Sequence, residues 1–184
     1  GSFVGGLVGT NSGTLSESSF TGSVTGSNYI GGLVGYNDVS KTISKSYSTG
    51  SVTGSNYIGG LVGFNNGLVD NTYSNVDVTG VDSVGGLIGK SDHSTTDVSK
   101  SYSTGSVSGT LRVGGFIGEN PIGCSASFWN LQTSGQSTDS CASGKTSLLM
   151  KTQSTFTNAG WDFSNTWKMP SNNKGPPCLK WEQN

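Results

Sequence analysis

The stretch SNYIGGLVGYN at residues 27–37 returns almost unchanged as SNYIGGLVGFN at residues 55–65. Its central part, here named the glycine motif, occurs as FVGGLVG from Phe3, YIGGLVG from Tyr29 and Tyr57, SVGGLIG from Ser83 and RVGGFIG from Arg112. These copies start 26, 28, 26 and 29 residues apart. A period in this range indicates a repeat protein, in which each unit buries its apolar residues against its neighbours.

Two further segments recur between the glycine motifs. SYSTGSVTG from Ser46 represents the first, and KTISKS from Lys41 represents the second and weaker one. Both are short, contain β-branched or aromatic residues, and are bounded by Gly, Asn or Ser, which is typical of strands and turns. Three short strands in a unit of about 27 residues predict an all-β fold, a triangular β-solenoid whose strands pair in parallel between coils. Right-handed winding is expected for such parallel β-helices.

Stacked coils place equivalent residues in ladders about 4.8 Å apart. Three ladders are expected to face inward: Val4, Ile30, Ile58, Val84 and Val113; Val8, Val34, Val62, Ile88 and Ile117; and Val24, Val52, Val78 and Val107. The paired glycines are expected where the walls of the coil come close together. A fourth ladder of side-chain amides is expected from Asn11, Asn37, Asn65 and Asn120, interrupted by Ser91.

The same two-residue alternation predicts two candidate binding surfaces. A hydroxyl face, interrupted by Asp77, is expected from Ser23, Thr25, Ser51, Thr53, Thr79, Ser106 and Ser108. The opposite parity of the glycine motif gives an apolar face with Tyr29 and Tyr57 in one file and Leu33 and Leu61 in another. A contiguous apolar face favours a contact surface. The ordinary alternatives are that exposed strands are commonly rich in Ser and Thr, and that a glycine bulge turns the leucines inward.

The chain divides into repeats at residues 1–123, about five coils, and a capping segment at residues 124–184. The capping segment loses the repeat and contains Trp161, Trp167 and Trp181, together with a stretch that can form a short helix. Because an open solenoid end exposes unpaired strand groups, we expect these aromatic residues to pack on the last coil. At the other end, Gly1-Ser2 resembles a cloning remnant before a repeat that begins at Phe3, so a longer parent protein is expected.

Three cysteines, Cys124, Cys141 and Cys178, lie in the last third of the chain. In a secreted protein an odd count leaves one disulfide and a spare thiol. We favour Cys124 with Cys141; pairing of Cys178 with either of them and three reduced thiols are the alternatives. A zinc site is disfavoured because no Cys-x-x-Cys pair is present and His93 is the single histidine.

Composition excludes several classes of protein. Hydrophobic residues make up 31% of the chain, against about 45–50% in ordinary globular proteins, so a thick core is not expected. Ten basic and eleven acidic residues leave a net charge of −1 without a basic stripe, which argues against nucleic acid as a partner. No apolar stretch reaches the roughly 18 residues of a membrane helix, so no membrane span is expected in this segment.

The unit GGLVGYNDVSKTISKSYSTGSV at residues 31–52 resembles the GLUG repeat. This repeat is found in large secreted and cell-surface bacterial and archaeal proteins, including adhesin-like proteins and the non-catalytic part of certain immunoglobulin A proteases. The tail from FWNLQTSG to NTWKM is similar to the segment that closes such arrays, but Phe128-Trp129-Asn130 stands where the family has Tyr-Trp-Asp. Likewise Pro177-Cys178-Leu179-Lys180-Trp181 replaces Pro-Tyr-Leu-Arg-Trp. The resemblance implies a secreted or surface-located β-solenoid and carries no catalytic motif.

No set of residues indicates catalysis. Gly144-Lys145-Thr146 is not a phosphate loop, because Asp139 stands where that motif needs a glycine. Asp92 and Asp97 can join only a weak calcium site, since the aspartate nonapeptide of calcium-binding β-rolls is absent. Carboxylates do not recur at equivalent positions in neighbouring coils, as a glycoside-cleaving solenoid would need. We therefore expect no catalytic residues, no cofactor and no metal.

Two classes of function follow. The first is a non-catalytic module that offers a rigid flat surface for adhesion to glycans, to host or neighbouring cells, or to other copies of itself. The second is ice binding, since the Ser and Thr files resemble the Thr-x-Thr arrays of antifreeze solenoids. An accessory domain of a secreted protease or glycan-active enzyme is a further alternative.

Overall fold

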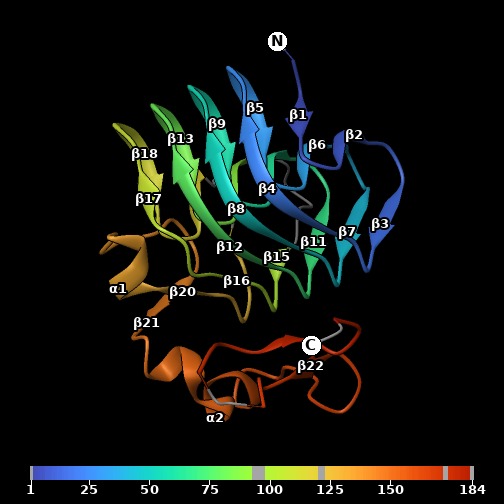
Figure 1. Cartoon of the computed structure of the whole chain (residues 1–184), viewed down its shortest axis with the longest axis vertical. Coiled ribbons are helices and arrows are strands. Elements are labelled where there is room, and N and C mark those ends of the chain that lie inside the picture. The colour runs from blue at the N-terminus through green and yellow to red at the C-terminus, as the bar shows by residue number, and fades with distance from the viewer. Residues whose placement is uncertain (1, 93–97, 120–122, 172–173, 183–184) are drawn as a thin grey trace.

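The computed structural model describes residues 2–92, 98–119, 123–171 and 174–182. It is an all-β solenoid of about four turns, with parallel sheets stacked along one axis as predicted. Figure 1 shows the coils side by side, with the N-terminal coil at one end and the C-terminal segment below the coils.

Each glycine motif forms two strands, because the chain bends at its second glycine. The first strands pair as sheet A, which contains β1 (Val4–Gly5), β5 (Asn28–Gly31), β9 (Asn56–Gly59), β13 (Asp82–Gly85) and β18 (Leu111–Gly114). The second strands pair as sheet B, which contains β2 (Val8–Asn11), β6 (Val34–Asn37), β10 (Val62–Asn65), β14 (Ile88–Ser91) and β19 (Ile117–Glu119).

The two segments between the glycine motifs form the other walls. Sheet C contains β3 (Thr14–Ser16), β7 (Thr42–Ser44), β11 (Leu68–Asp70) and β15 (Val98–Ser99). Sheet D contains β4 (Ser19–Thr25), β8 (Tyr47–Thr53), β12 (Tyr73–Thr79), β16 (Tyr102–Ser103), β17 (Val107–Ser108), β20 (Phe128–Asn130) and β21 (Ser143–Lys145). A coil therefore has four walls, where the sequence led us to expect three strands, because the glycine corner splits one expected strand into two.

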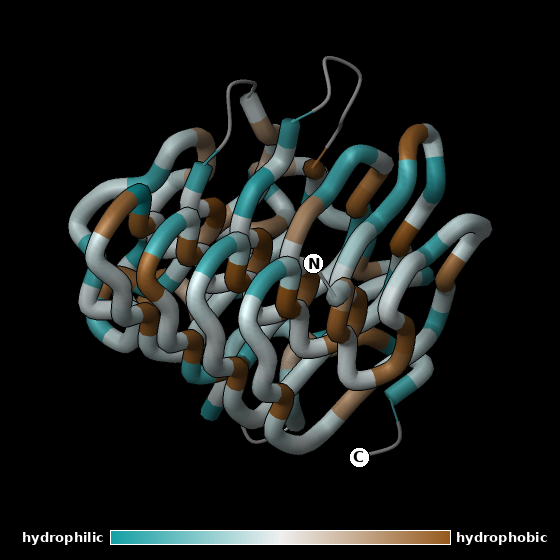
Figure 2. Tube along the Cα trace, turned by 90° about the horizontal axis from the view of Figure 1, so that it is seen from above, coloured by the Kyte–Doolittle hydropathy of each residue, from teal (hydrophilic) through white to brown (hydrophobic). Residues whose placement is uncertain are grey.

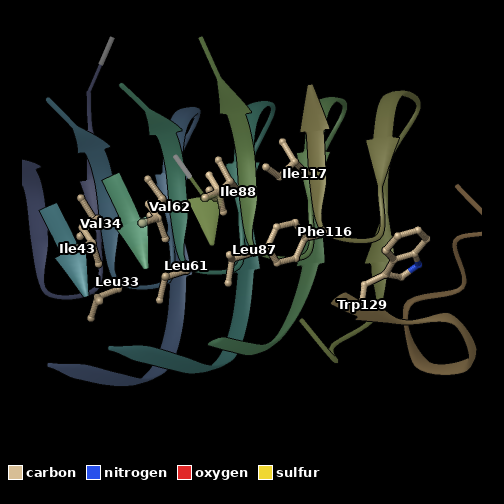
Figure 3. Packing of buried hydrophobic residues seen from close by; sticks show 12 residues of the cluster. Leu33, Val34, Ile43, Leu61, Val62, Leu87, Ile88, Phe116, Ile117 and Trp129 are labelled. Carbon is tan, nitrogen blue, oxygen red and sulfur yellow. The ribbon is translucent and has the colours of Figure 1, made fainter. Parts of the chain in front are cut away.

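Parallel pairing holds equivalent residues of the repeat in register. Val4 pairs with Ile30, and Ile30 with Ile58, so that like residues stack from coil to coil. Hydrophobic stretches consequently recur at matching places in successive coils (Figure 2). All three expected aliphatic ladders line the core, and the valines of sheet D form one of its clusters. One cluster of buried hydrophobic residues runs along the solenoid from Leu33 to Trp129 (Figure 3).

The paired glycines face a file of small side chains inside the coil. A Cβ added to Gly60 would lie 2.1 Å from Ser74 Oγ and 2.2 Å from the carbonyl oxygen of Gly86, so no larger residue fits there. In the middle coils this file consists of the buried residues Ser48, Ser74 and Ser103. At its two ends the file carries the large rings of Phe20 and Trp129, against which Gly6 and Gly115 pack. The glycines thus let the corner between sheets A and B approach sheet D.

An amide ladder runs along the corner after sheet B. Asn11 Nδ2 donates to Asn37 Oδ1 at 2.8 Å, and Asn37 Nδ2 donates to Asn65 Oδ1 at 2.8 Å. Asn65 Nδ2 then donates to Ser91 Oγ at 3.3 Å, so the serine accepts the last bond of this chain of amides. Asn120, the remaining expected member, lies outside the described residues. These bonds satisfy buried polar groups that the turns would otherwise leave unpaired.

The first part of the capping segment closes the last coil. Asp139 Oδ2 accepts hydrogen bonds of 2.7 Å from the backbone N–H groups of Phe116 and Ile117. In the preceding coils the equivalent N–H groups, for example those of Leu87 and Ile88, donate to a backbone carbonyl of the next coil. The Asp139 carboxylate therefore takes the place of a further coil. The predicted disulfide between Cys124 and Cys141 holds this loop, with a Cα–Cα distance of 5.4 Å.

The second part lies along the flank of the solenoid, which differs from the expected packing on the last coil. It contains η1, a 3-10 helix (Leu149–Lys151), α2 (Gln153–Thr157) and the antiparallel pair β22 (Trp167–Lys168) and β23 (Cys178–Leu179). Its tryptophan N–H groups reach three different coils: Trp181 donates to Lys45 O, Trp167 to Asn71 Oδ1 and Trp161 to Ala126 O. The rings cover a stacked file at the start of the sheet D strands, formed by Tyr47, Tyr73, Tyr102 and Phe128. The capping segment thus buries a file of aromatic residues along the side of the solenoid in addition to its open end.

Candidate functional site

The outward side of sheet D is a polar surface, here named the polar face. Its strands alternate buried valines, such as Val52 and Val78, with outward polar residues. The outward residues form three files across the coils: Thr21, Thr49, Asn75 and Thr104; Ser23, Ser51, Asp77 and Ser106; and Thr25, Thr53, Thr79 and Ser108. All of them are exposed or half-buried. The structure therefore brings every predicted residue of the hydroxyl face to one surface.

Neighbouring side chains of the polar face bond to one another across the coils. The hydroxyl groups of Thr21 and Thr49 lie 2.9 Å apart, and Ser51 Oγ donates to Ser23 Oγ at 2.9 Å. Asp77, which interrupts the serine file, accepts from both the backbone N–H and the hydroxyl of Ser106, at 3.0 and 2.7 Å. These contacts tie side chains of neighbouring coils together, and because a hydroxyl can donate one hydrogen bond and accept two, each keeps further capacity for hydrogen bonds.

The apolar face predicted for the glycine motif is not present, because its leucine file is buried. Leu33, Leu61, Leu87 and Phe116 have no exposed surface and line the core in Figure 3. The bend at the second glycine breaks the two-residue alternation, so that Leu33 and the following Val34 both face inward. Leu33 and Leu61 are therefore core residues. This agrees with the alternative interpretation of the sequence, in which the glycines turn the leucines inward.

Tyr29 and Tyr57, the other half of that surface, do lie outside the coil. Both have a positive φ, 56° and 60°, and their rings stack at a centroid distance of 4.8 Å. Phe64 packs edge-on against both rings, so their faces are largely occupied by one another. Further along the solenoid the same surface becomes charged, with Lys90 Nζ 3.3 Å from a Glu119 carboxylate oxygen. The aromatic and charged side chains at this corner therefore contact one another along the solenoid.

The second part of the capping segment, which contains η1, α2, β22 and β23, is here named the flanking segment. A cleft of about 390 Å³ borders the polar face where the capping segment meets sheet D. Thr49, Asn75 and Thr104, which form one file of the polar face, line its solenoid side. Residues of the capping segment, including Asn130, Thr133 and Lys151, line the other side. Cavities of about 300–1,000 Å³ are typical of small-ligand sites. The polar face is thus hollowed along one margin.

The flanking segment is attached behind this cleft through buried tyrosines. The hydroxyl of Tyr73 donates to Glu182 Oε2 at 2.8 Å, and that of Tyr102 donates to Pro177 O at 2.8 Å. Burial raises the pKa of the Glu182 carboxyl, while hydrogen bonds from Leu179 N–H and the Tyr73 hydroxyl oppose that shift. Burial also raises the pKa of both tyrosines, so they stay neutral donors at physiological pH. The cleft wall is therefore fixed by hydrogen bonds as well as by ring packing.

Metal ligation finds no support in the described parts of the chain, where no three His, Cys, Asp or Glu side chains gather. Asp92 lies 3.6 Å from Lys90 Nζ in an ion pair. Its suggested calcium partner Asp97, like His93, lies outside the described residues. Among the helices that the structure describes, none is long and apolar enough to cross a membrane. Comparisons of the chain with protein-family models, curated proteins and solved structures found no match.

Sequence reasoning missed one file of the polar face and the whole cleft. The file that contains Thr49 and Asn75 continues the alternation by two residues, so the same parity argument applied further along the strand would have found it. Asn130 and Lys151 carry no repeat signal, since they belong to the capping segment. Their proximity to the polar face depends on how that segment folds back along the flank.

Proposed function

We propose that this chain is a non-catalytic binding module of a secreted or cell-surface protein, and that it attaches to glycans through the polar face. The observation that carries the proposal is the registered array of outward Ser and Thr side chains on a rigid parallel sheet. Each hydroxyl both donates and accepts hydrogen bonds, as sugar hydroxyls do. Asn75 and Asp77 add an amide and a carboxylate to the same surface.

The rigidity of the polar face favours attachment. Its central strands, β8 and β12, are paired on both sides, and hydrogen bonds across the coils hold side chains in two of its three files. A binding surface that is ordered before contact loses little conformational entropy on association. Because the array repeats along the solenoid, a long polysaccharide can contact several coils at once, and such multivalency strengthens weak individual contacts.

An extracellular setting and the GLUG-like repeat support the same proposal. The Cys124–Cys141 disulfide is compatible with an oxidising compartment, where such bonds persist. The resemblance of the repeat unit to GLUG repeats points to adhesin-like parent proteins. With Leu33 and Leu61 buried, the polar face replaces the apolar face as the contact surface, so self-association through those leucines is no part of the proposal.

Ice binding is the second candidate, and one observation favours it. The outward hydroxyls recur at the coil spacing in three files, which gives a lattice of oxygen atoms. Asn75 and Asp77 interrupt two of those files in the same strand, β12, and Asp77 places a hydrated charge in the centre. A charged, well-hydrated carboxylate disturbs ordered water, so we rank glycan attachment first.

Two measurements on the wild-type protein separate the candidates. Glycan attachment predicts saturable binding to members of a glycan array and growth of round, unshaped ice crystals without thermal hysteresis. Faceted crystals and a freezing gap, with no glycan bound, would overturn the proposal and promote ice binding. A readout that is negative in both assays would also contradict it.

A further inference from the structure

We propose that the cleft at the margin of the polar face is a subsite for an acidic sugar, a pyranose unit that carries a carboxylate. This inference rests on the proposed function, since it names the part of a glycan that the module selects. Three features of the cleft carry it: its composite walls, an accessible amide donor, and an unopposed positive charge.

The walls combine apolar and polar groups in the way that small-ligand sites do. Tyr73, Tyr102 and Pro176 line the floor and supply carbon surface, while Thr49 and Thr104 supply hydroxyls. Thr104 Oγ1 donates to Asn75 Oδ1 at 3.2 Å, which orients the Asn75 amide with its NH₂ group free to donate. A sugar ring offers both a carbon-bound face and hydroxyl groups to such a site.

Asn130 lines the cleft with a largely buried side chain whose amide NH₂ group is accessible. Its Oδ1 accepts from the backbone N–H groups of Gln132 and Thr133, at 3.0 and 3.3 Å, as the N-cap of α1 (Leu131–Ser134), and from Ser147 Oγ at 3.0 Å. These three bonds fix which side of the amide carries the oxygen. The side chain is only 6% exposed and lines the cleft, yet no hydrogen bond within the described ranges uses its Nδ2. The Asn130 NH₂ group can therefore donate to an acceptor atom of a ligand in the cleft.

Lys151 gives the cleft its charge. Of the described residues that line it, Lys151 alone has a charged side chain, and none carries a carboxylate. The ammonium group forms no ion pair with the part of the chain that the structure describes. Donors from Asn130 and Lys151 on one side, with the Asn75 amide opposite, favour a ligand rich in acceptor oxygens. Hydrogen bonds between such donors and a carboxylate are charge-assisted and are stronger than neutral ones.

The test follows the side-chain amide resonances of the ¹⁵N-labelled full chain during titration with glucuronic acid and with glucose. Asn130→Asp keeps an oxygen that can cap α1 but removes the NH₂ donor and adds a negative charge. This variant also assigns the Asn130 NH₂ resonance, which it deletes. Lys151→Gln removes the positive charge, and Lys41→Gln is the control at a half-buried position directly before β7, on another wall of the solenoid.

The proposal expects glucuronic acid to shift the Asn130 NH₂ resonance at concentrations where glucose does not. Asn130→Asp and Lys151→Gln should each weaken glucuronic acid binding by about tenfold or more, and Lys41→Gln should leave it unchanged. Equal shifts with the two sugars, no shift with either, or equal affinities for all variants would overturn the proposal. If glycan attachment by the wild type persists in Asn130→Asp and Lys151→Gln, the cleft assignment fails while the proposed function stands.

Discussion

At the residue scale, the fold depends on positions where a side chain would not fit. The second glycine of each motif lies against a serine or an aromatic ring of sheet D and against the backbone of the next coil. This contact is what gives four walls to a coil and turns the leucines inward. The sequence predicts that the glycine pairs lie where the walls come close together. It does not decide whether the chain bends there, because a straight strand through the two glycines fits the same sequence.

Gly60→Ala tests this packing directly. The new Cβ would meet Ser74 Oγ and the Gly86 carbonyl far inside contact distance, at 2.1 and 2.2 Å. Because one of these atoms belongs to the backbone, rotation of a side chain cannot relieve the clash, and we expect a loss of about 3 kcal/mol in the free energy of unfolding. Gly13→Ala is the control, since nothing lies within 4 Å of its added Cβ, and its effect should stay within about 0.5 kcal/mol. Chemical denaturation with equal costs for the two variants would show that the glycine corner is not close-packed.

At the element scale, the capping segment both closes the last coil and covers the aromatic file along the flank of the solenoid. The sequence predicted only a cover for the last coil. The loss of the repeat, together with the three tryptophans, predicted that it covers the end of the solenoid. The segment buries the aromatic file of Tyr47, Tyr73 and Tyr102. The repeated SYS and TYS sequences indicate that these tyrosines stack, but they do not indicate which residues cover them. Lateral packing over several coils is a long-range contact without a periodic signal, so pattern reasoning placed the aromatics at the open end.

Asp139→Ala tests the claim that a carboxylate replaces the next coil. The substitution removes the acceptor of two inter-coil N–H groups and also the two bonds of 2.9 Å that Oδ1 accepts from Cys141 and Ala142. Hydrogen bonds to a charged group contribute about 1.5–3 kcal/mol each, so the two inter-coil bonds alone lead us to expect a loss of at least about 3 kcal/mol with the disulfide intact. Asp162→Ala is the matched control, because Asp162 also accepts two turn N–H groups but at the exposed surface. A loss at Asp139 no larger than at Asp162 would refute the surrogate-coil interpretation.

At the scale of the whole molecule, the repeat forms a solenoid that carries the files of outward polar side chains on one wall, sheet D. The fold class, the inward aliphatic ladders, the amide ladder and the outward hydroxyls all follow from a period near 27 residues combined with strand alternation. The cleft does not, because it exists only where the non-repeating segment lies beside the polar face. The proposed sugar subsite lies where the two parts meet, because there the regular hydroxyl files border side chains of the capping segment.

The most direct test of this account compares binding of three proteins to the best glycan found on the array. Ser51→Tyr puts bulk in the middle of the polar face, while Thr10→Tyr makes the same kind of addition on sheet B, where Thr10 pairs with Tyr36. Thermal unfolding verifies that both variants are folded. We predict that Ser51→Tyr binds the glycan about tenfold or more weakly than wild type, and that Thr10→Tyr binds equally well. Equal affinities of all three proteins would contradict the claim that the polar face is the binding surface.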